Sequence, residues 1–301
     1  RYLYDALVKR IKEKGITEKT QSVNVWVLEK AGIPHLPVTN KTRSILIALV
    51  VGLFGGVGFA FFLEYLDNTI KTPEDVEEKY NLPVLSTIDL YQKKSMTIIE
   101  DVLANPSSAN AENFRGLRTS VMLSSADKTP KILMSTSMTP GEGKSSVSVC
   151  MAASIAQTGK KVLLIDADMR RPMLHKIFNA SNTYGLSSLL AGISKKENQQ
   201  LLYHPIKNLD LVTSGPIPPN PAELLSAHRI PELLNQFSKK YEMIVIDTPP
   251  IISVTDPVIM SSHVDGVLLV TWSGKTTFEL FKTGLKQLQN VSAPVTGVVL
   301  N

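Results

Sequence analysis

The sequence predicts an α/β fold of the P-loop NTPase type, with a mostly parallel sheet flanked by helices. A glycine-rich loop, residues 138–146, lies between an apolar run and a helical segment, and two later apolar runs each end in aspartate. Short continuous apolar runs are typical of parallel strands that are buried on both faces. Strands are expected near residues 131–135, 162–166, 209–213, 243–247, 266–271 and 295–300, and helices near 145–157, 230–239 and 277–289.

The glycine-rich loop has the chemistry of a phosphate cradle. Gly141 and Gly143 let successive backbone N–H groups turn toward one anion, and Lys144 supplies a positive charge for the outer phosphates. Ser145 offers a hydroxyl to Mg²⁺. Met138 stands where the common pattern has glycine, so the loop alone is equally compatible with an ordinary Gly-Pro turn. As a nucleotide site it comprises Thr139, Pro140, Gly141, Glu142, Gly143, Lys144, Ser145 and Ser146.

Three aspartates follow buried strands. Asp166 and Asp168 end the run that begins at Val162, and Asp247 ends the run that begins at Met243. A single aspartate after a strand is usually a cap or a turn residue. Because parallel strands end at one crevice, three of them beside a phosphate loop favour Mg²⁺ binding and catalysis.

The expected roles divide among these acids and the loop. Ser145 with Asp168 or Asp247 would organise Mg²⁺, and Lys144 would hold the β- and γ-phosphates of ATP. Asp166 is the candidate to accept a hydroxyl proton, although the spacing does not separate its role from that of Asp168. Arg170 and Arg171 are expected to pair with acids.

These motifs resemble those of a known family. The loop, the Asp-x-Asp strand and the segment Ile246-Asp247-Thr248-Pro249-Pro250 are similar to the Walker A, A′ and B motifs of bacterial tyrosine kinases of the Wzc type, the polysaccharide co-polymerases of capsule and exopolysaccharide export. Residues 112–119 and 215–225 match the family as well. The resemblance implies a membrane-anchored tyrosine autokinase, with Lys144, Asp166, Asp168 and Asp247 as catalytic residues and ATP and Mg²⁺ as cofactors.

The resemblance also implies partners. It places Glu112, Arg115 and Arg118 in contacts between subunits of a homo-oligomeric ring, whereas the residues alone fit an ordinary solvated helix face. A cognate tyrosine phosphatase and the polysaccharide export machinery are expected partners. Asn301 could contact the adenine, or simply end a strand. The family's acceptor tyrosines cluster beyond the last strand, but none of the eight tyrosines follows Tyr241, so a missing tail is expected.

One segment predicts a transmembrane helix. Residues 45–63 contain no charged residue and are close to the length of about 20 residues that spans a bilayer. Gly52 and Gly56 form a G-x-x-x-G pair that is consistent with self-association. The flanking charges weakly favour the opposite orientation. A nucleotide site must nevertheless face the cytoplasm, so residues after Leu63 are placed inside the cell and earlier residues in the periplasm.

The chain therefore divides into four expected parts. They are the end of a periplasmic domain (1–43), a transmembrane helix (44–63), a cytoplasmic connector (64–110) and a P-loop kinase domain (111–301). In the first part, residues 2–11 have helical spacing, and residues 23–27 alternate like a strand. In the connector, Thr72 followed by Pro73 predicts the start of a helix. Arg1 is not a start methionine, so the chain is expected to be a fragment of a longer protein. That protein is expected in the bacterial inner membrane.

Composition excludes several classes of function. The mean hydropathy of +0.05 fits a soluble domain with one span, and the net charge of +5 is scattered without a basic run, so nucleic-acid binding has little support. The single cysteine, Cys150, excludes a disulfide framework and a zinc-finger site. Two other functions stay open: a ParA/MinD-type ATPase, against which Thr139 and the apolar span argue, and a scaffold whose nucleotide only controls assembly.

Overall fold

The structure is a computed structural model of the chain. It describes residues 2–20, 40–89, 97–105, 107–124, 129–196, 200–226 and 228–301. The chain divides into two compact units, Arg1–Leu66 and Asp67–Asn301. Each unit is described by itself.

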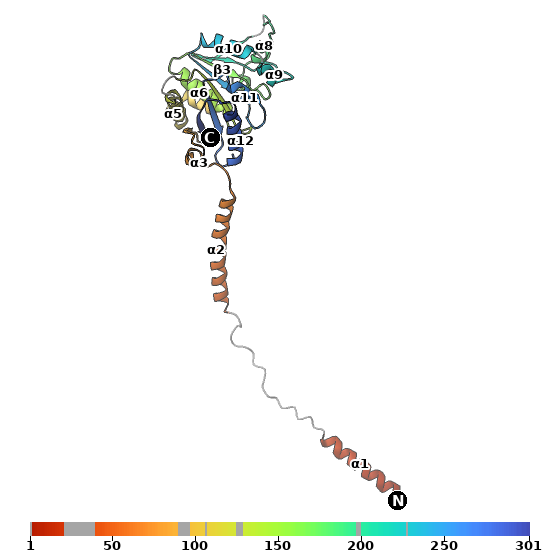
Figure 1. Ribbon diagram of the computed structural model, residues 1–301. Helices are drawn as coiled ribbons and strands as arrows, with labels where there is room; N and C mark the ends of the chain where they lie inside the picture. The colour runs from red at the N-terminus through yellow and green to blue at the C-terminus, as the bar shows by residue number, and fades with distance from the viewer. Residues whose placement is uncertain are drawn as a thin grey trace. The chain divides into compact units, whose positions relative to one another are not determined.

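The first unit contains two helices, α1 (Tyr2–Thr20) and α2 (Lys41–Leu66) (Figure 1). None of the α2 side chains is buried, and the most apolar part of this 26-residue helix has a mean hydropathy of 2.6. Among the described residues, α2 is the one helix that is long and apolar enough to cross a membrane. The expected span, 44–63, lies within it. The expected strand at 23–27 lies outside the described residues.

The second unit is built on a sheet of eight strands in the order β1-β8-β7-β2-β6-β3-β5-β4. All neighbours are parallel except β4, which pairs antiparallel with β5 at one edge. The strands are β1 (Val84–Thr87), β2 (Ile132–Ser137), β3 (Val162–Asp166), β4 (Leu202–Ile206), β5 (Leu209–Val212), β6 (Met243–Asp247), β7 (Gly266–Thr271) and β8 (Val295–Leu300).

Helices cover both faces of this sheet. They are α3 (Pro73–Tyr80), α4 (Ile98–Ala104), α5 (Ala109–Leu123), α6 (Lys144–Ala156), α7 (Leu174–Ile177), α8 (Leu186–Leu190), α9 (Pro221–Ser226), α10 (Arg229–Ser238), α11 (Asp256–Ser261) and α12 (Phe278–Asn290). The predicted fold class is confirmed, since a mostly parallel sheet is enclosed between two layers of helices (Figure 1).

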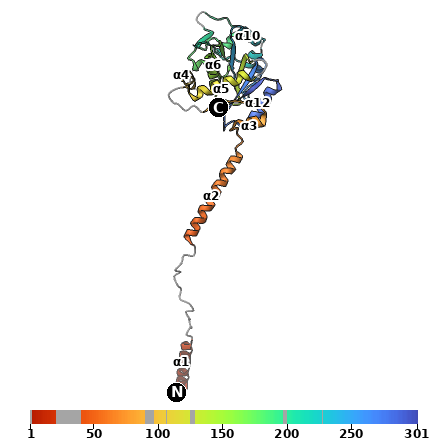
Figure 2. The same ribbon diagram turned by 90° about the vertical axis from the view of Figure 1, so that its left-hand side faces the viewer.

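Two hydrophobic cores separate the layers. Successive strand side chains point to opposite faces of a sheet, so Leu133 of β2 joins the core beneath α4, α5 and α6, while Met134 joins the core beneath α10 and α12. Figure 2 shows α4, α5 and α6 close together, in agreement with their mutual contacts. Because both faces are buried, the central strands β3 and β6 are apolar up to the aspartate at their ends.

The strands and helices expected after residue 111 have counterparts in the structure, and the second unit contains two further strands. The sequence pattern did not indicate β1 or β4. Both are short edge strands, and β4 contains Pro205, which lacks the N–H that a ladder uses. The expected helices near 145–157, 230–239 and 277–289 correspond to α6, α10 and α12.

The start of the second unit differs from the expected domain boundary. The segment expected as a connector, 64–110, contributes β1 to the sheet through its parallel pairing with β8. Ile70, Val76 and Ile88 from this segment are buried in the two cores. The compact unit therefore begins at Asp67 rather than at residue 111. A four-residue strand between polar stretches carries too little periodicity to reveal this from the sequence.

Candidate nucleotide and phosphoryl-transfer site

The loop between β2 and α6 is shaped by two glycines. Gly141 and Gly143 both have φ of +88°, a conformation that side-chain-bearing residues rarely adopt, and Gly143 forms the N-cap of α6. Lys144 is then the first residue of the helix, so the loop leads into a helix N-terminus, where backbone N–H groups favour an anion. Met138 is fully buried, and Gly284 of α12 leaves the room that its sulfur occupies.

The register of the sheet brings the carboxylates to this loop. Asp166 at the end of β3 lies opposite Asp247 at the end of β6, and Asp247 lies opposite Ser135 of β2 on its other side. The three strands are neighbours in the sheet. Two carboxylates therefore lie at the same sheet edge from which the phosphate loop leaves β2.

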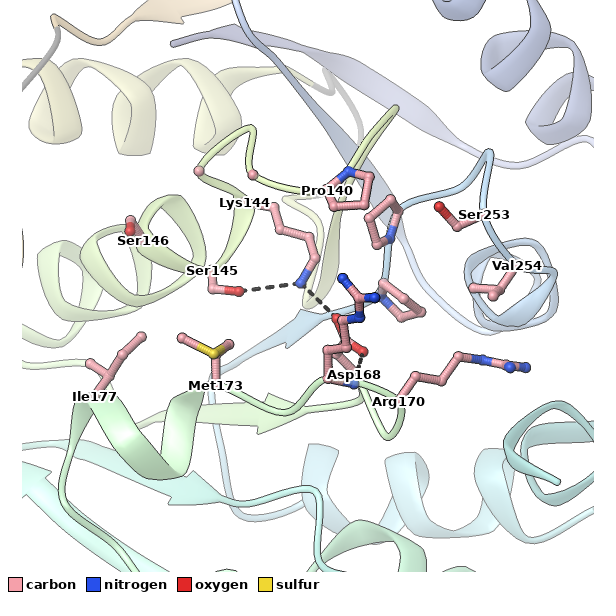
Figure 3. Close-up of a pocket in the computed structure, with 15 residues that line it drawn as sticks. Pro140, Lys144, Ser145, Ser146, Asp168, Arg170, Met173, Ile177, Ser253 and Val254 are labelled. Atoms are coloured by element: carbon pink, nitrogen blue, oxygen red, sulfur yellow. Dashed lines mark hydrogen bonds and ion pairs between the residues drawn. The ribbon is translucent and has the colours of Figure 1, made fainter. Parts of the chain in front are cut away.

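Lys144 is the centre of the site. Its ammonium lies 3.1 Å from Asp168 Oδ2 and donates to Ser145 Oγ at 3.2 Å (Figure 3). It also lies 3.3 Å from Asp247 Oδ2. Only 12% of the Lys144 side chain is exposed. The lysine is thus held between the two strand ends that supply the acids, at the start of the phosphate-binding helix.

Two serine hydroxyl groups hold the carboxylate of Asp247 in addition to Lys144. Ser145 Oγ donates to Asp247 Oδ2 at 2.6 Å, and Ser148 Oγ donates to Asp247 Oδ1 at 3.1 Å. Ser135 and Ser148 are in turn hydrogen-bonded to each other. Because each oxygen of this fully buried carboxylate has a partner, its orientation toward Ser145 is fixed.

Asp166 faces inward and organises backbone. It accepts N–H groups from Asp168 at 3.2 Å, Met173 at 3.2 Å and Leu174 at 3.1 Å. Asp168, by contrast, faces the cavity, and its second oxygen accepts the N–H of Arg171 at 2.9 Å. The two acids of the Asp-x-Asp motif therefore have different environments, which their spacing alone could not separate.

A cavity of about 590 Å³ opens in front of these groups. Figure 3 shows Lys144 and Asp168 in contact at its wall, with Met173 and Ile177 on one side and Pro140 on another. Its wall combines the phosphate loop with an apolar part. The lining residues are Pro140, Gly141, Gly143, Lys144, Ser145, Ser146, Asp168, Arg170, Arg171, Met173, Ile177, Pro249, Pro250, Ser253 and Val254.

Comparisons with known proteins identify the family. The sequence model described as an AAA domain matches residues 131–295. Tyrosine-protein kinase YwqD of Bacillus subtilis is 43% identical over 199 residues, which cover 66% of this chain and 84% of that protein. The kinase domain of the Escherichia coli tyrosine kinase ETK superposes with a TM-score of 0.70 at 33% identity, over 77% of this chain and 94% of that domain. The chain belongs to the bacterial tyrosine kinases.

The chain spans less than half the length of several relatives. It covers 44% of tyrosine-protein kinase etk of Escherichia coli, at 32% identity over the whole of this chain, and 41% of EpsB from Ralstonia nicotianae. The crystal structure of the chimerical protein CapA2B2 has a TM-score of 0.70 at 37% identity, covering 76% of this chain and 98% of that one.

Electrostatics keep Lys144 charged. Burial acts to lower the pKa of Lys144, but the carboxylates of Asp247 and Asp168 outweigh it, and the pKa lies above its ordinary value. Burial raises the pKa of Asp166 to about 8, and repulsion from Asp247 adds to this effect. Burial also raises the pKa of Asp247, against the attraction of Lys144.

Three of the expected nucleotide-binding residues do not line the cavity. Glu142 is 2% exposed, and its carboxylate accepts the Met138 N–H at 2.7 Å and the Thr139 N–H at 3.0 Å. Thr139 donates its hydroxyl to the same carboxylate. Asn301 donates its side-chain amide to the Glu142 carbonyl at 2.9 Å, so in this structure it supports the loop from behind. These contacts connect the loop to the sheet.

The three charged residues of α5 that are expected in subunit contacts, Glu112, Arg115 and Arg118, have two different environments. Glu112 and Arg115 form an ion pair on the outer face of α5. Arg118 instead donates to the carbonyl of Ser154 at 2.8 Å and thereby ties α5 to α6 within the subunit. Only the first two side chains present their charges outward.

Other residues of the site were not indicated by the sequence. Ser148 orients Asp247, and Met173 and Ile177 supply part of the apolar wall. Their signal was weak because small or apolar residues in a helix normally indicate packing.

Arg170 forms an ion pair with the buried Asp256 through two hydrogen bonds of 2.9 Å each, in agreement with its expected pairing with an acid.

Proposed function

We propose that this chain is the anchor and catalytic part of a protein-tyrosine autokinase. It transfers the γ-phosphate of ATP to tyrosines of itself or of a neighbouring subunit and so regulates capsule or exopolysaccharide polymerisation and export. The observation that carries the proposal is the position of Lys144 between Asp168 and Asp247, at the mouth of a cavity formed by the phosphate loop.

The loop residues suit a nucleoside triphosphate. The two positive-φ glycines expose consecutive backbone N–H groups at the start of α6, and Lys144 adds a full positive charge. In the present arrangement that charge is balanced by carboxylates. A triphosphate would replace them as the partner of Lys144, and phosphoryl transfer relies mainly on such positioning and charge neutralisation.

The donor set also fits Mg²⁺. Ser145 Oγ and Asp247 Oδ2 lie 2.6 Å apart, and Asp168 lies on the other side of the same lysine. Oxygen ligands from one or two carboxylates together with substrate phosphates are typical of Mg²⁺ in phosphoryl-transfer sites. Bound there, Mg²⁺ would neutralise the charge of the β- and γ-phosphates. Ser145 and Asp247 are the residues that would hold it.

Asp168 is the carboxylate best placed to meet an acceptor. It lines the cavity, whereas Asp166 is fully buried behind it and bonded to three backbone N–H groups. A general base must come within hydrogen-bond reach of the proton it removes. We therefore assign proton acceptance from the tyrosine hydroxyl to Asp168 and a positioning role to Asp166.

The location of the site follows from the same proposal. ATP is a cytoplasmic substrate, so the unit after Leu66 lies in the cytoplasm, α2 spans the inner membrane and the residues before it face the periplasm. The relatives are named as tyrosine-protein kinases, and one is attributed to a cps region. A homo-oligomeric ring, a tyrosine phosphatase and the polysaccharide export machinery are the partners proposed on this basis.

Replacing Lys144 tests the proposed activity. In detergent, with Mg·ATP and a synthetic tyrosine-containing peptide as acceptor, Lys144→Met should lower phosphotyrosine formation by at least about 100-fold, because a preorganised charge opposite the transferring group is lost. Lys239→Met, the same change at an exposed position after α10, is the matched control and should retain activity. ATP hydrolysis without phosphotyrosine in the wild-type protein would instead favour an ATP-controlled assembly scaffold.

A further inference from the structure

The carboxylate of Glu142 lies inside the phosphate loop and points away from the cavity. It is 2% exposed and accepts four hydrogen bonds. One oxygen accepts the N–H groups of Met138 and Thr139, at 2.7 and 3.0 Å. The other accepts the hydroxyl groups of Thr139, at 3.1 Å, and of Thr276. Three of these donors belong to the loop itself, and only Thr276 comes from elsewhere in the fold.

Thr276 lies in the turn between β7 and α12, and this turn is fixed. The side chain is 1% exposed, and its oxygen also accepts the Trp272 N–H at 3.2 Å. The Thr276 carbonyl accepts the N–H of Ile70 at 2.9 Å, and the Gly274 N–H donates to the Ile70 carbonyl at 2.8 Å. The hydroxyl that reaches Glu142 therefore projects from a turn whose backbone is held on both sides.

A second contact reaches the same residue from the end of β8. Asn301 donates its side-chain amide to the Glu142 carbonyl at 2.9 Å, and its backbone is bonded to Thr271 at 2.8 Å and to Ser273 at 2.9 Å. A methyl group at Gly143 would come within 2.3 Å of the Asn301 amide nitrogen. Both the side chain and the main chain of Glu142 are thus held by the elements that follow β7.

We propose that Glu142 and Thr276 are a positioning pair that holds the phosphate loop in its anion-binding shape before nucleotide arrives. This proposal rests on the proposed nucleotide-binding function. It adds to the site Thr276, which lies 132 positions after Lys144 and outside the sequence motifs of the site. Its hydroxyl acts on the nucleotide only through Glu142. Glu142 itself touches the loop backbone rather than the cavity.

The consequence concerns affinity more than rate. Without the Thr276 hydroxyl, the loop keeps its own three donors to Glu142 but loses its connection to the fixed turn. If the loop becomes ordered only when nucleotide binds, the loss of conformational entropy weakens the binding. Once nucleotide is bound, Lys144, Asp168 and Asp247 remain in place for transfer. Loss of the pair should therefore raise the Kd and KM for Mg·ATP and leave kcat nearly unchanged.

Three variants of the whole chain test the pair. Thr276→Val removes the hydroxyl at nearly constant volume and should raise the Kd and KM for Mg·ATP about tenfold, since hydrogen bonds to charged groups contribute on this scale. Its kcat should stay within about twofold. Thr276→Ser restores the hydroxyl and should return the Kd to within about twofold. Thr283→Val, whose hydroxyl bonds the carbonyl of Glu279 on its own helix, is the matched control and should bind like wild type.

A wild-type Kd in Thr276→Val, or a fall in kcat at unchanged Kd, would overturn the proposal. Glu142→Gln provides the second measurement if Thr276→Val does not fold, because it keeps the shape of the side chain while placing an amide N–H₂ against hydrogen-bond donors. It should raise the Kd by at least as much. Calorimetric binding of Mg·ATP separates the positioning pair from the proposed kinase activity. A wild-type protein that binds nucleotide but forms no phosphotyrosine contradicts only the proposed activity.

Discussion

At the scale of single residues, the site shows one residue type in three different environments. Asp247 is fixed by two serine hydroxyls, Asp168 faces the cavity beside Lys144, and Asp166 is enclosed by backbone N–H groups. Burial shifts a carboxylate toward its neutral form, while hydrogen-bond donors and a lysine favour the charged form. The division of roles that we propose for the acids follows from these surroundings rather than from their order in the chain.

Asparagine at each position of the Asp-x-Asp motif tests that division. Asp168→Asn should lower the rate of phosphotyrosine formation by about 100-fold or more, the usual effect of losing general-base catalysis, with only a small change in nucleotide affinity. Asp166→Asn should mainly lower the melting temperature, because an amide cannot accept all three backbone N–H groups on its single oxygen. Rapid-quench phosphotyrosine measurements and thermal melts of both variants provide the comparison. The reverse pattern would make Asp166 the base.

The sequence predicted which residues converge at the site better than it predicted where each side chain points. Spacing after buried strands was enough to place Asp168 and Asp247 beside Lys144, because parallel strands share one carboxyl edge. It could not show that Glu142 turns inward or that Asn301 contacts the loop carbonyl. Those orientations depend on donors from a turn far along the chain, which no local pattern contains.

At the scale of elements, long and fully buried segments were predicted and short edge segments were not. β3, β6 and β7 are buried along their whole length, whereas β1 has four residues, none of them fully buried. An edge strand pairs with only one neighbouring strand, so it can form with fewer buried apolar side chains than a central strand. α5 belongs to the first group, with Phe114, Leu117 and Val121 packed onto α6.

The outer face of α5 carries the predicted subunit contact. Alanine at Glu112, Arg115 and Arg118 together should lower the oligomer mass in detergent, measured by light scattering, because opposite charges facing a neighbour are lost. Three exposed residues in or just after α10, Glu232, Gln236 and Lys239, changed to alanine serve as the control and should leave the mass unchanged. Arg118→Ala alone should lower the melting temperature by a few degrees with the oligomer intact, since that side chain bonds within the subunit. An unchanged mass in the triple variant would contradict the contact.

At the scale of the whole molecule, the segment after the apolar helix completes the catalytic unit. β1 covers the edge of β8, and Ile70 bonds the turn that carries Thr276. Ile70, Val76 and Ile88 are each at most 2% exposed. The residues that connect the apolar helix to the sheet are therefore part of the fold that positions the phosphate loop, and a domain boundary drawn after them would divide a single core.

Two truncations test this boundary. A fragment of residues 67–301 should fold cooperatively and bind Mg·ATP, because it contains the whole compact unit. In size-exclusion chromatography it should elute as a monomer or as one defined oligomer. A fragment of residues 111–301 loses the buried apolar side chains of Ile70, Val76, Ile88 and Val102. They contribute about 1.5–3 kcal/mol each, or roughly 6–12 kcal/mol together, against a typical total of about 5–15 kcal/mol. It also exposes the β8 edge, a template for aggregation. Thermal melts and size-exclusion chromatography would compare the two fragments, and a soluble 111–301 fragment melting within a few degrees of the longer one would place the boundary at residue 111 after all.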